Sequence, residues 1–434
     1  MGNRIKEIIG WLNNKRDNTS VNIEQVSFSE LRNWSFNSTN GALEHESKKF
    51  FSIIGIDVET NYPSSYNRWQ QPIINQPEIG ILGFISRKIN DETFYLMQAK
   101  IEPGNLNYVQ LSPTLQATKS NYSRVHKGES PNFLKYFLDT KKKIVLDQLQ
   151  SEQGARFLRK RNRNIIIEIE DDIDISSDFM WLTLNDINAL MNVDNCVNMD
   201  TRTVLSSLIL EDSNIDTNLN DSLYSFDEII HWMTSLKTYY ELYVKQIHLK
   251  SVDHWKISDD SISHNDNKYF EVIPVKIEIE GREVNSWAQP MIKSLQDGLC
   301  ALIIKKIKGQ PHLLIQGKVE CGNFDIIEMA PTVQCLTDNY SKNTNLPYLK
   351  YVMESENENI FYDTFQSEEG GRFYKEENRN IIILADESFS IQLPKNYIWL
   401  TLKQTKYFLK FNNFFNIQAR SLISALVSRE NEIY

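Results

Sequence analysis

The stretch SEQGARFLRKRNRNIIIEI, residues 151–169, decides the fold because it returns as SEEGGRFYKEENRNIIILA at residues 367–385. Outward from it, RWQQPII around Trp69 matches SWAQPMI around Trp287, and MQAKIEPGN matches IQGKVECGN, each at an offset of 218 residues. WLTL at Trp181 returns at Trp399 with the same offset. Repetition at a constant long interval indicates duplicated structural units, so the chain consists of two copies of one unit.

The size of the repeated unit predicts the domain organisation. A unit of about 215 residues has the size of an ordinary domain. We therefore expect one domain at residues 1–215 and a second at residues 216–434. The join is expected within residues 211–222, EDSNIDTNLNDS. Such a segment, rich in Asn, Asp and Ser and poor in apolar side chains, is typical of a surface linker.

Each copy combines strand and helix patterns. The β-branched and aromatic runs FFSIIGIDV, GILGFIS, TFYLMQAKI and NIIIEIE predict strands. Helical spacing predicts helices in PNFLKYFLDTKKKIVLDQLQ (131–150) and WLTLNDINALMN (181–192), with Thr183 and Thr401 as capping residues. The expected fold class is α/β or α+β, with a sheet flanked by helices in each copy.

Composition excludes several classes of protein. The net charge of −10 arises from mixed acidic and basic residues without a basic stripe, which argues against a nucleic-acid partner. Four scattered cysteines fit reduced thiols in a cytoplasmic protein. The first residues lack the apolar core of a secretory signal, and no apolar run is long enough to predict a membrane span.

The most informative strand is TFYLMQAKIEPGN, because alternation along a strand puts Gln98, Lys100 and Glu102 on one face. Gln316, Lys318 and Glu320 repeat this arrangement in the second copy. Buried polar groups without partners are costly, so this face lines either a polar cavity or the solvent at a sheet edge.

Other side chains are candidates for binding a ligand. Trp69 and Trp287 are either stacking platforms or core residues. Arginine side chains clamp diphosphates or form structural ion pairs, and six of them are candidates: Arg156, Arg163, Arg202, Arg372, Arg379 and Arg420. The turns and polar tracts add further hydrogen-bonding groups, namely Asn105, Thr114, Gln116, Asn121, Tyr122, Asn339 and Tyr340.

Known catalytic motifs are missing from the sequence. It contains no GxGxxG following a strand, no P-loop, no close histidine pair and no GxSxG elbow. The Glu-rich box with which Nudix hydrolases hold magnesium is also absent. These absences remove support for dinucleotide redox chemistry, phosphoryl transfer and metal-dependent hydrolysis.

Longer tracts carry a family resemblance. QPIINQPEIGILG, LSPTLQATKSNYSRVHKG, LQSEQGARFLRKRNRN and VNMDTRTVLS resemble the NDP-hexose 2,3-dehydratases, and APTVQC, SEEGGRFYKEENRN and NIQARSLISAL extend the match through the second copy. The resemblance implies a Nudix-like fold in each half, a homodimer, and two nucleotide-sugar pockets of which one performs the reaction. The implied substrate is dTDP-4-keto-6-deoxyglucose and the product a 3,4-diketo-2,6-dideoxy sugar nucleotide, consumed next by a ketoreductase or aminotransferase.

The implied reaction needs no cofactor. A ketone at carbon 4 acidifies the hydrogen on carbon 3, so the enzyme supplies a base, donors for the enolate oxygen and an acid for the departing 2-hydroxyl. A sugar-nucleotide pyrophosphohydrolase and a non-catalytic sugar-nucleotide sensor remain the alternatives.

Differences between the copies suggest which pocket works. Glu78, Lys119 and His126 of the first copy correspond to Gln296, Thr337 and Thr344 of the second. We therefore expect the first pocket to be catalytic. His126 or Glu78 is the candidate base or acid, Tyr122 a second proton donor, and Lys100 the group near the enolate oxygen.

Overall fold

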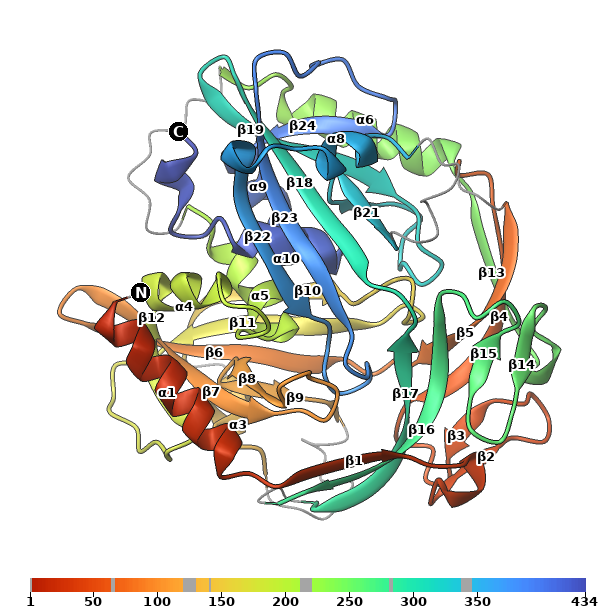
Figure 1. Ribbon diagram of the computed structural model, residues 1–434. Helices are drawn as coiled ribbons and strands as arrows, with labels where there is room; N and C mark the ends of the chain where they lie inside the picture. Colours follow the sequence, from red (N-terminus) through yellow and green to blue (C-terminus); the bar gives the residue numbers. More distant parts are fainter. Residues whose placement is uncertain are drawn as a thin grey trace.

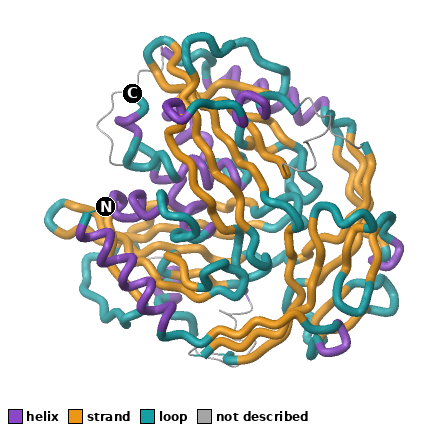
Figure 2. The backbone as a smooth tube through the Cα atoms, in the orientation of Figure 1, coloured by secondary structure: helices purple, strands orange, loops and turns teal. Residues whose placement is uncertain are grey.

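The structure is a computed structural model that describes residues 2–63, 67–119, 130–139, 142–210, 221–280, 284–336 and 346–434. It confirms a mixed α/β architecture with several sheets (Figures 1 and 2). The expected linker, residues 211–222, lies almost entirely outside the described residues.

The first repeat contains the following elements, in chain order: α1 (Asn3–Asp17), β1 (Val21–Gln25), η1 (Phe28–Glu30), β2 (Trp34–Phe36), β3 (Leu43–His45), β4 (Ser52–Thr60), β5 (Arg68–Asn75), β6 (Gly80–Ile89), β7 (Glu92–Ile101), β8 (Val109–Ser112), β9 (Leu115–Ala117), α3 (Leu134–Leu138), β10 (Lys143–Ser151), β11 (Arg161–Glu168), β12 (Phe179–Thr183), α4 (Leu184–Met191), α5 (Met199–Leu205) and η2 (Ser206–Leu208).

The second repeat follows the same order: α6 (Phe226–Tyr239), β13 (Leu242–Ile247), η4 (Leu249–Ser251), β14 (Trp255–Ile257), β15 (Ile262–His264), β16 (Phe270–Ile279), β17 (Ser286–Ser294), β18 (Gly298–Ile307), β19 (Gln310–Lys318), β20 (Glu328–Ala330), β21 (Val333–Leu336), α8 (Leu349–Met353), η5 (Asn357–Asn359), β22 (Ile360–Ser367), β23 (Glu377–Ala385), β24 (Tyr397–Thr401), α9 (Leu402–Leu409), α10 (Ile417–Ser424) and η6 (Glu430–Glu432).

Each repeat builds a seven-stranded mixed sheet in which one central pair is parallel: β6 with β11, and β18 with β23. The apolar run that forms β6 is explained by burial of its two faces. Leu82 and Phe84 enter a core with α1, α4 and α5, whereas Ile81 and Ile85 pack against α3. A strand covered on two faces needs apolar side chains in succession.

The four predicted strand runs coincide with β4, β6, β7 and β11, and Thr183 and Thr401 form the expected capping boxes of α4 and α9. The predicted helix over 131–150 is wrong beyond Leu138. Lys143–Ser151 is instead β10, an antiparallel partner of β11. Pairing with β11 stabilises an extended conformation there, so tertiary context overrides the helical spacing.

Each repeat donates one strand to the other. β1 pairs with β16 of the second repeat, and β13 pairs with β4 of the first. Figure 1 shows β1 running from the end of α1 towards the opposite half of the molecule. The two small sheets are therefore completed only when the repeats associate.

Glycines let the repeats approach each other at backbone distance. The Gly104 amide donates to the Gly370 carbonyl over 2.7 Å, and the Gly322 amide donates to the Gly154 carbonyl over 2.7 Å. A Cβ on Gly104 would lie 1.7 Å from the Phe373 carbonyl oxygen. Only glycine fits at such a crossing, so these turns join the two repeats.

None of the helices in the described part of the chain combines the length and the apolar character needed to cross a membrane.

Candidate active site

A cavity of about 500 Å³ opens at the junction of the two repeats, and we call it the composite cavity. Its floor is the polar face of β7, which contributes Gln98, Lys100 and, just beyond the strand, Glu102. Thr114 and Gln116 lie beside them at β9. Gln116 donates to the Glu102 carboxylate over 2.6 Å, so the predicted polar face forms a connected surface.

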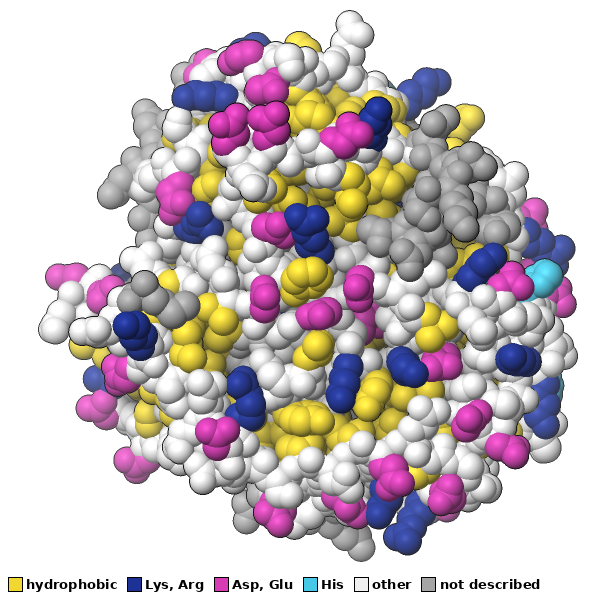
Figure 3. Space-filling view, in the orientation of Figure 1, with side chains coloured by type: hydrophobic (Ala, Val, Ile, Leu, Met, Phe, Trp, Pro, Cys, Tyr) yellow, Lys and Arg dark blue, Asp and Glu magenta, His cyan; other side chains and the backbone are white. Residues whose placement is uncertain are grey.

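The opposite wall of the composite cavity comes from the second repeat. Trp287 and Gln289 project from β17, and Glu369 and Arg372 from the loop after β22. The Gln289 amide donates to the Gly371 carbonyl over 2.6 Å and accepts from the Trp287 indole over 2.9 Å. On the face drawn in Figure 3, acidic and basic side chains lie close together near the centre.

Three aromatic rings and a histidine of the first repeat complete the wall: Trp34, His45, Phe50 and Phe51. The Trp34 indole donates to the Ala288 carbonyl over 2.9 Å, and the Arg372 guanidinium lies 5.4 Å from the centroid of the Phe51 ring. Side chains of the two repeats thus interlock around the opening, with an apolar surface next to a cation.

Five acidic side chains line the cavity, namely Glu102, Glu152, Asp178, Asp200 and Glu369. Burial raises the pKa of Asp200 well above its usual value, and the neighbouring Glu152 and Glu102 carboxylates raise it further. Burial also raises the pKa of Glu152 to about 7, although Arg420 and Lys160 oppose the shift. Burial therefore favours the protonated form of both carboxyls, and Glu152 exchanges its proton near neutrality.

Cations balance this acidic group. Lys100 donates to the Gln116 carbonyl over 3.3 Å, and Lys160 donates to the Glu78 carbonyl. Burial lowers the pKa of Lys160, which Glu78 and Glu152 partly offset. Carboxyl groups with raised pKa values beside lysines form an arrangement suited to moving protons on a bound molecule.

The corresponding positions of the second repeat differ in chemistry. Asp200, Lys160 and Glu369 are replaced by Gln418, Glu376 and Gln153 respectively, as the alignment of the repeats shows. Lys318 and Glu320 are kept. Trp69 and Arg156 occupy the positions equivalent to Trp287 and Arg372, and Arg156 lies 4.2 Å from the centroid of the Phe270 ring.

A tyrosine of the first repeat also occupies the second repeat's polar face. The buried Tyr62 hydroxyl donates to the Gly317 carbonyl over 3.0 Å and accepts from Gln316 over 3.2 Å. Asn396 donates to the same oxygen over 3.0 Å. Gln316 is therefore engaged by protein, whereas its counterpart Gln98 lines the composite cavity.

Four of the predicted arginines lie elsewhere. Arg163 and Arg379 form two-point ion pairs with Asp147 and Asp363 on neighbouring strands. Arg202 and Arg420 are fully buried between the repeats and donate to acceptors of the opposite repeat, including the Ser367 and Ser151 carbonyls. Their placement gives these four a structural explanation and argues against the predicted diphosphate contacts.

Other predicted residues divide into two groups. Glu78 accepts from Gln76 over 2.5 Å beside the composite cavity, and Asn105 is fully buried against Gly370. The second group, Asn121, Tyr122, His126, Asn339 and Tyr340, lies outside the described residues, so the roles predicted for it stay predictions.

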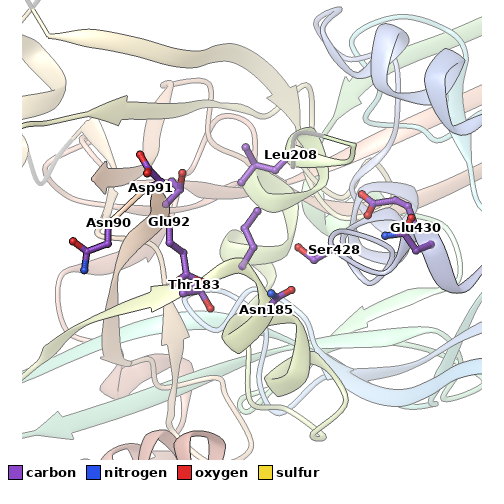
Figure 4. Close-up of a pocket in the computed structure, with 11 residues that line it drawn as sticks. Asn90, Asp91, Glu92, Thr183, Asn185, Leu208, Ser428 and Glu430 are labelled. Atoms are coloured by element: carbon purple, nitrogen blue, oxygen red, sulfur yellow. The ribbon is translucent and has the colours of Figure 1, made fainter. Parts of the chain in front are cut away.

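A second depression, of about 610 Å³, lies between the β6–β7 turn, the start of α4 and the C-terminal segment (Figure 4). Two of its polar groups serve the fold: Thr183 caps α4, and Glu430 accepts from the Leu210 amide over 2.7 Å. None of the predicted site residues lines it, so the composite cavity is the candidate active site.

The fold and the cavity define a two-repeat protein with buried acidic and basic side chains at the junction of its halves, and comparison identifies its family. The model of the NDP-hexose 2,3-dehydratase family matches residues 5–208 and 226–426, so the chain belongs to that family. It is 41% identical to a dTDP-4-dehydro-6-deoxy-alpha-D-glucopyranose 2,3-dehydratase of Saccharopolyspora spinosa, over 96% of this chain and 90% of that protein.

Two further relatives have the same name. The protein of Amycolatopsis orientalis is 38% identical over 98% of this chain and 90% of its own length. That of Streptomyces violaceoruber is 38% identical over 93% of each chain.

Sequence reasoning missed Glu152, Lys160, Asp200 and Glu369. A usable signal was present, because three of the four differ in chemical type from their counterparts in the second repeat. Nothing in the sequence indicates that Glu369 belongs to the other repeat's cavity.

Proposed function

We propose that this protein is a dTDP-4-dehydro-6-deoxyglucose 2,3-dehydratase whose reaction takes place in the composite cavity. Family membership and three relatives that share this name support the activity. The observation that carries the location is the meeting of Asp200, Glu152 and Lys100 in one cavity, since the second repeat lacks the first of these carboxyls.

The reaction is a β-elimination. A base removes the proton on carbon 3, and the electron pair is delocalised onto the carbon 4 oxygen as an enolate. The enolate then expels the 2-hydroxyl, which leaves as water after accepting a proton from an acid. The resulting enol at carbon 3 becomes a ketone when carbon 2 takes up a proton.

Protonation states assign the roles. Asp200 is the acid that protonates the leaving hydroxyl, because burial and the neighbouring carboxylates raise its pKa and favour the protonated form. Glu152 is the base at carbon 3, because its pKa of about 7 leaves a large ionised fraction. Lys100 stabilises the enolate oxygen, as expected from the sequence. Glu78, Tyr122 and His126 remain alternative proton carriers.

The nucleotide is held at the mouth of the composite cavity. Arg372 binds the diphosphate, since its guanidinium borders an aromatic wall and the cavity interior. Trp34, Phe51 and Trp287 supply faces on which a thymine ring stacks. The sugar then reaches inward to Lys100.

We also propose the duplication, the homodimer and the downstream enzyme that the family resemblance implies. The repeats arose by duplication of a Nudix-like unit, with domains at residues 1–215 and 216–434, and the chain forms a homodimer in the cytoplasm. A ketoreductase or aminotransferase consumes the unstable diketone. The shared element order and the repeated tracts support the duplication.

The test uses purified protein and dTDP-4-dehydro-6-deoxyglucose in D₂O, with a 3-ketoreductase and NADPH to trap the product. Mass spectrometry should show loss of one water and gain of one deuteron at carbon 2. The reductase alone is the control. Recovery of unchanged substrate, or release of a nucleoside monophosphate, would contradict the proposal.

A further inference from the structure

The two repeats contact each other where the loops after β10 and β22 meet. Glu152 and Gln153 of the first repeat correspond to Glu368 and Glu369 of the second. The Gln153 amide donates to the Glu368 carboxylate over 2.6 Å, across the boundary between the repeats. The symmetry-related pair on the other side of this boundary is Glu369 with Glu152, two carboxyls.

The amide–carboxylate pair holds Glu368 as a hydrogen-bond acceptor. Gln153 donates to one Glu368 oxygen and Asn378 donates to the other. Burial raises the pKa of Glu368, and the two donors partly offset this effect. This side of the boundary therefore has a fixed structural contact.

The carboxyl pair, Glu152 and Glu369, has different hydrogen-bond partners. Asn162 donates to one Glu152 oxygen over 2.6 Å, and the other oxygen has no partner within the described ranges. Glu369 accepts from the Gly371 amide over 3.0 Å and from Arg372 over 3.5 Å, which fixes its side chain at the cavity wall. Glu152 and Glu369 line the same cavity.

The charges acting on Glu152 come from both repeats. Arg420 of α10 and Lys160 favour its ionised form, whereas Glu369 opposes ionisation. Asp200 of α5 is electrostatically coupled to Glu152 as well. Glu369 is thus the acidic neighbour from the second repeat that counters the two cations.

We propose that Glu369 is a positioning residue for the dehydration in the first repeat: facing Glu152, it keeps that carboxyl able to exchange its proton. The proposal rests on the assignment of the reaction to the composite cavity. It also explains an advantage of one chain over a dimer of identical units. In a dimer of identical units, the residues that meet at this boundary would be the same on both sides. In the single chain they differ, so the carboxyl pair Glu152 and Glu369 on one side is combined with the fixed contact between Gln153 and Glu368 on the other.

The test is Glu369→Gln, which installs at Glu152 the amide contact already present between Gln153 and Glu368. The variant should fold with an unfolding temperature close to that of the wild type. Removing the acidic neighbour lowers the pKa of Glu152, so the acidic limb of the kcat/KM profile should move to lower pH by about one unit. Glu369→Asp keeps a carboxylate and should restore most of the wild-type profile.

Glu368→Gln is the matched control, because it removes a carboxyl from the equivalent pair outside the composite cavity. Its pH profile should equal that of the wild type. An unchanged profile in Glu369→Gln, an equal shift in the control, or failure of Glu369→Gln to fold would overturn the inference.

Failure of the proposed function gives a different result, namely no turnover by the wild type. In that case, infrared titration of the carboxyl C=O stretch in wild type, Glu369→Gln and Glu152→Gln measures the Glu152 pKa directly. If Glu369→Gln leaves the Glu152 pKa unchanged, the proposed effect of Glu369 on Glu152 is refuted.

Discussion

Replacement of Asp200 by Asn tests the proposed acid most directly. The side chain is almost completely buried, lines the composite cavity and lies in the first turn of α5. Asn has nearly the same shape and keeps a polar group, but it cannot give a proton to a leaving hydroxyl. A general acid contributes about 10²–10⁴ in rate, which is about 3–5 kcal/mol of transition-state stabilisation.

Stability should not account for that loss. The folded pKa of Asp200 is raised above its unfolded value, so its contribution to stability is present below the unfolded value and is lost as pH rises through the folded one. At neutral pH the unfolded carboxyl is ionised, so part of this contribution is already lost. The Asn variant should therefore be at least as stable as the wild type at pH 8.

The assay measures kcat by trapping the product with a 3-ketoreductase, and chemical denaturation gives the free energy of unfolding. Gln418→Asn, at the equivalent position of the second repeat, is the control and should keep wild-type turnover. If the Asp200→Asn variant keeps more than a tenth of the wild-type kcat, the assignment of Asp200 as the acid is refuted.

Three further predictions concern the junction of the repeats. Gly104→Ala should lower the free energy of unfolding by about 3 kcal/mol, measured by denaturation, because the new Cβ meets the Phe373 carbonyl. Fragments 1–215 and 216–434 should each fail to give a folded monomer by size-exclusion chromatography, yet form a soluble complex when co-expressed, because each lacks a strand the other supplies. Burial raises the Glu328 pKa to about 8, so the free energy of unfolding of the wild type should fall as pH rises from about 4.5 through about 8. Glu328→Gln should reduce this fall, as measured by chemical denaturation at pH 5 and pH 9.

Local patterns in the sequence predicted local structure well. The apolar runs of β6 and β11 and the capping boxes of α4 and α9 depend on residues close in the chain, so their patterns predict them. The helix expected over 131–150 failed at Lys143, because pairing with a distant strand decided that segment.

The candidate site was predictable in part. Alternation along β7 placed Gln98, Lys100 and Glu102 together, and all three line the composite cavity. Arg202 and Arg420 were predicted as diphosphate ligands, since a sequence does not distinguish a guanidinium facing a cavity from one buried between two repeats. Chain topology makes that distinction.

By itself the sequence determined that the chain contains two copies of one unit, that strands and helices alternate in each, and which dehydratase family it resembles. These properties reside in short tracts and their spacing. Only the tertiary structure decided that β1 and β13 are exchanged and that Glu369 and Glu152 line one cavity. Contacts between residues more than 180 positions apart depend on how whole sheets pack, and no local pattern encodes that packing.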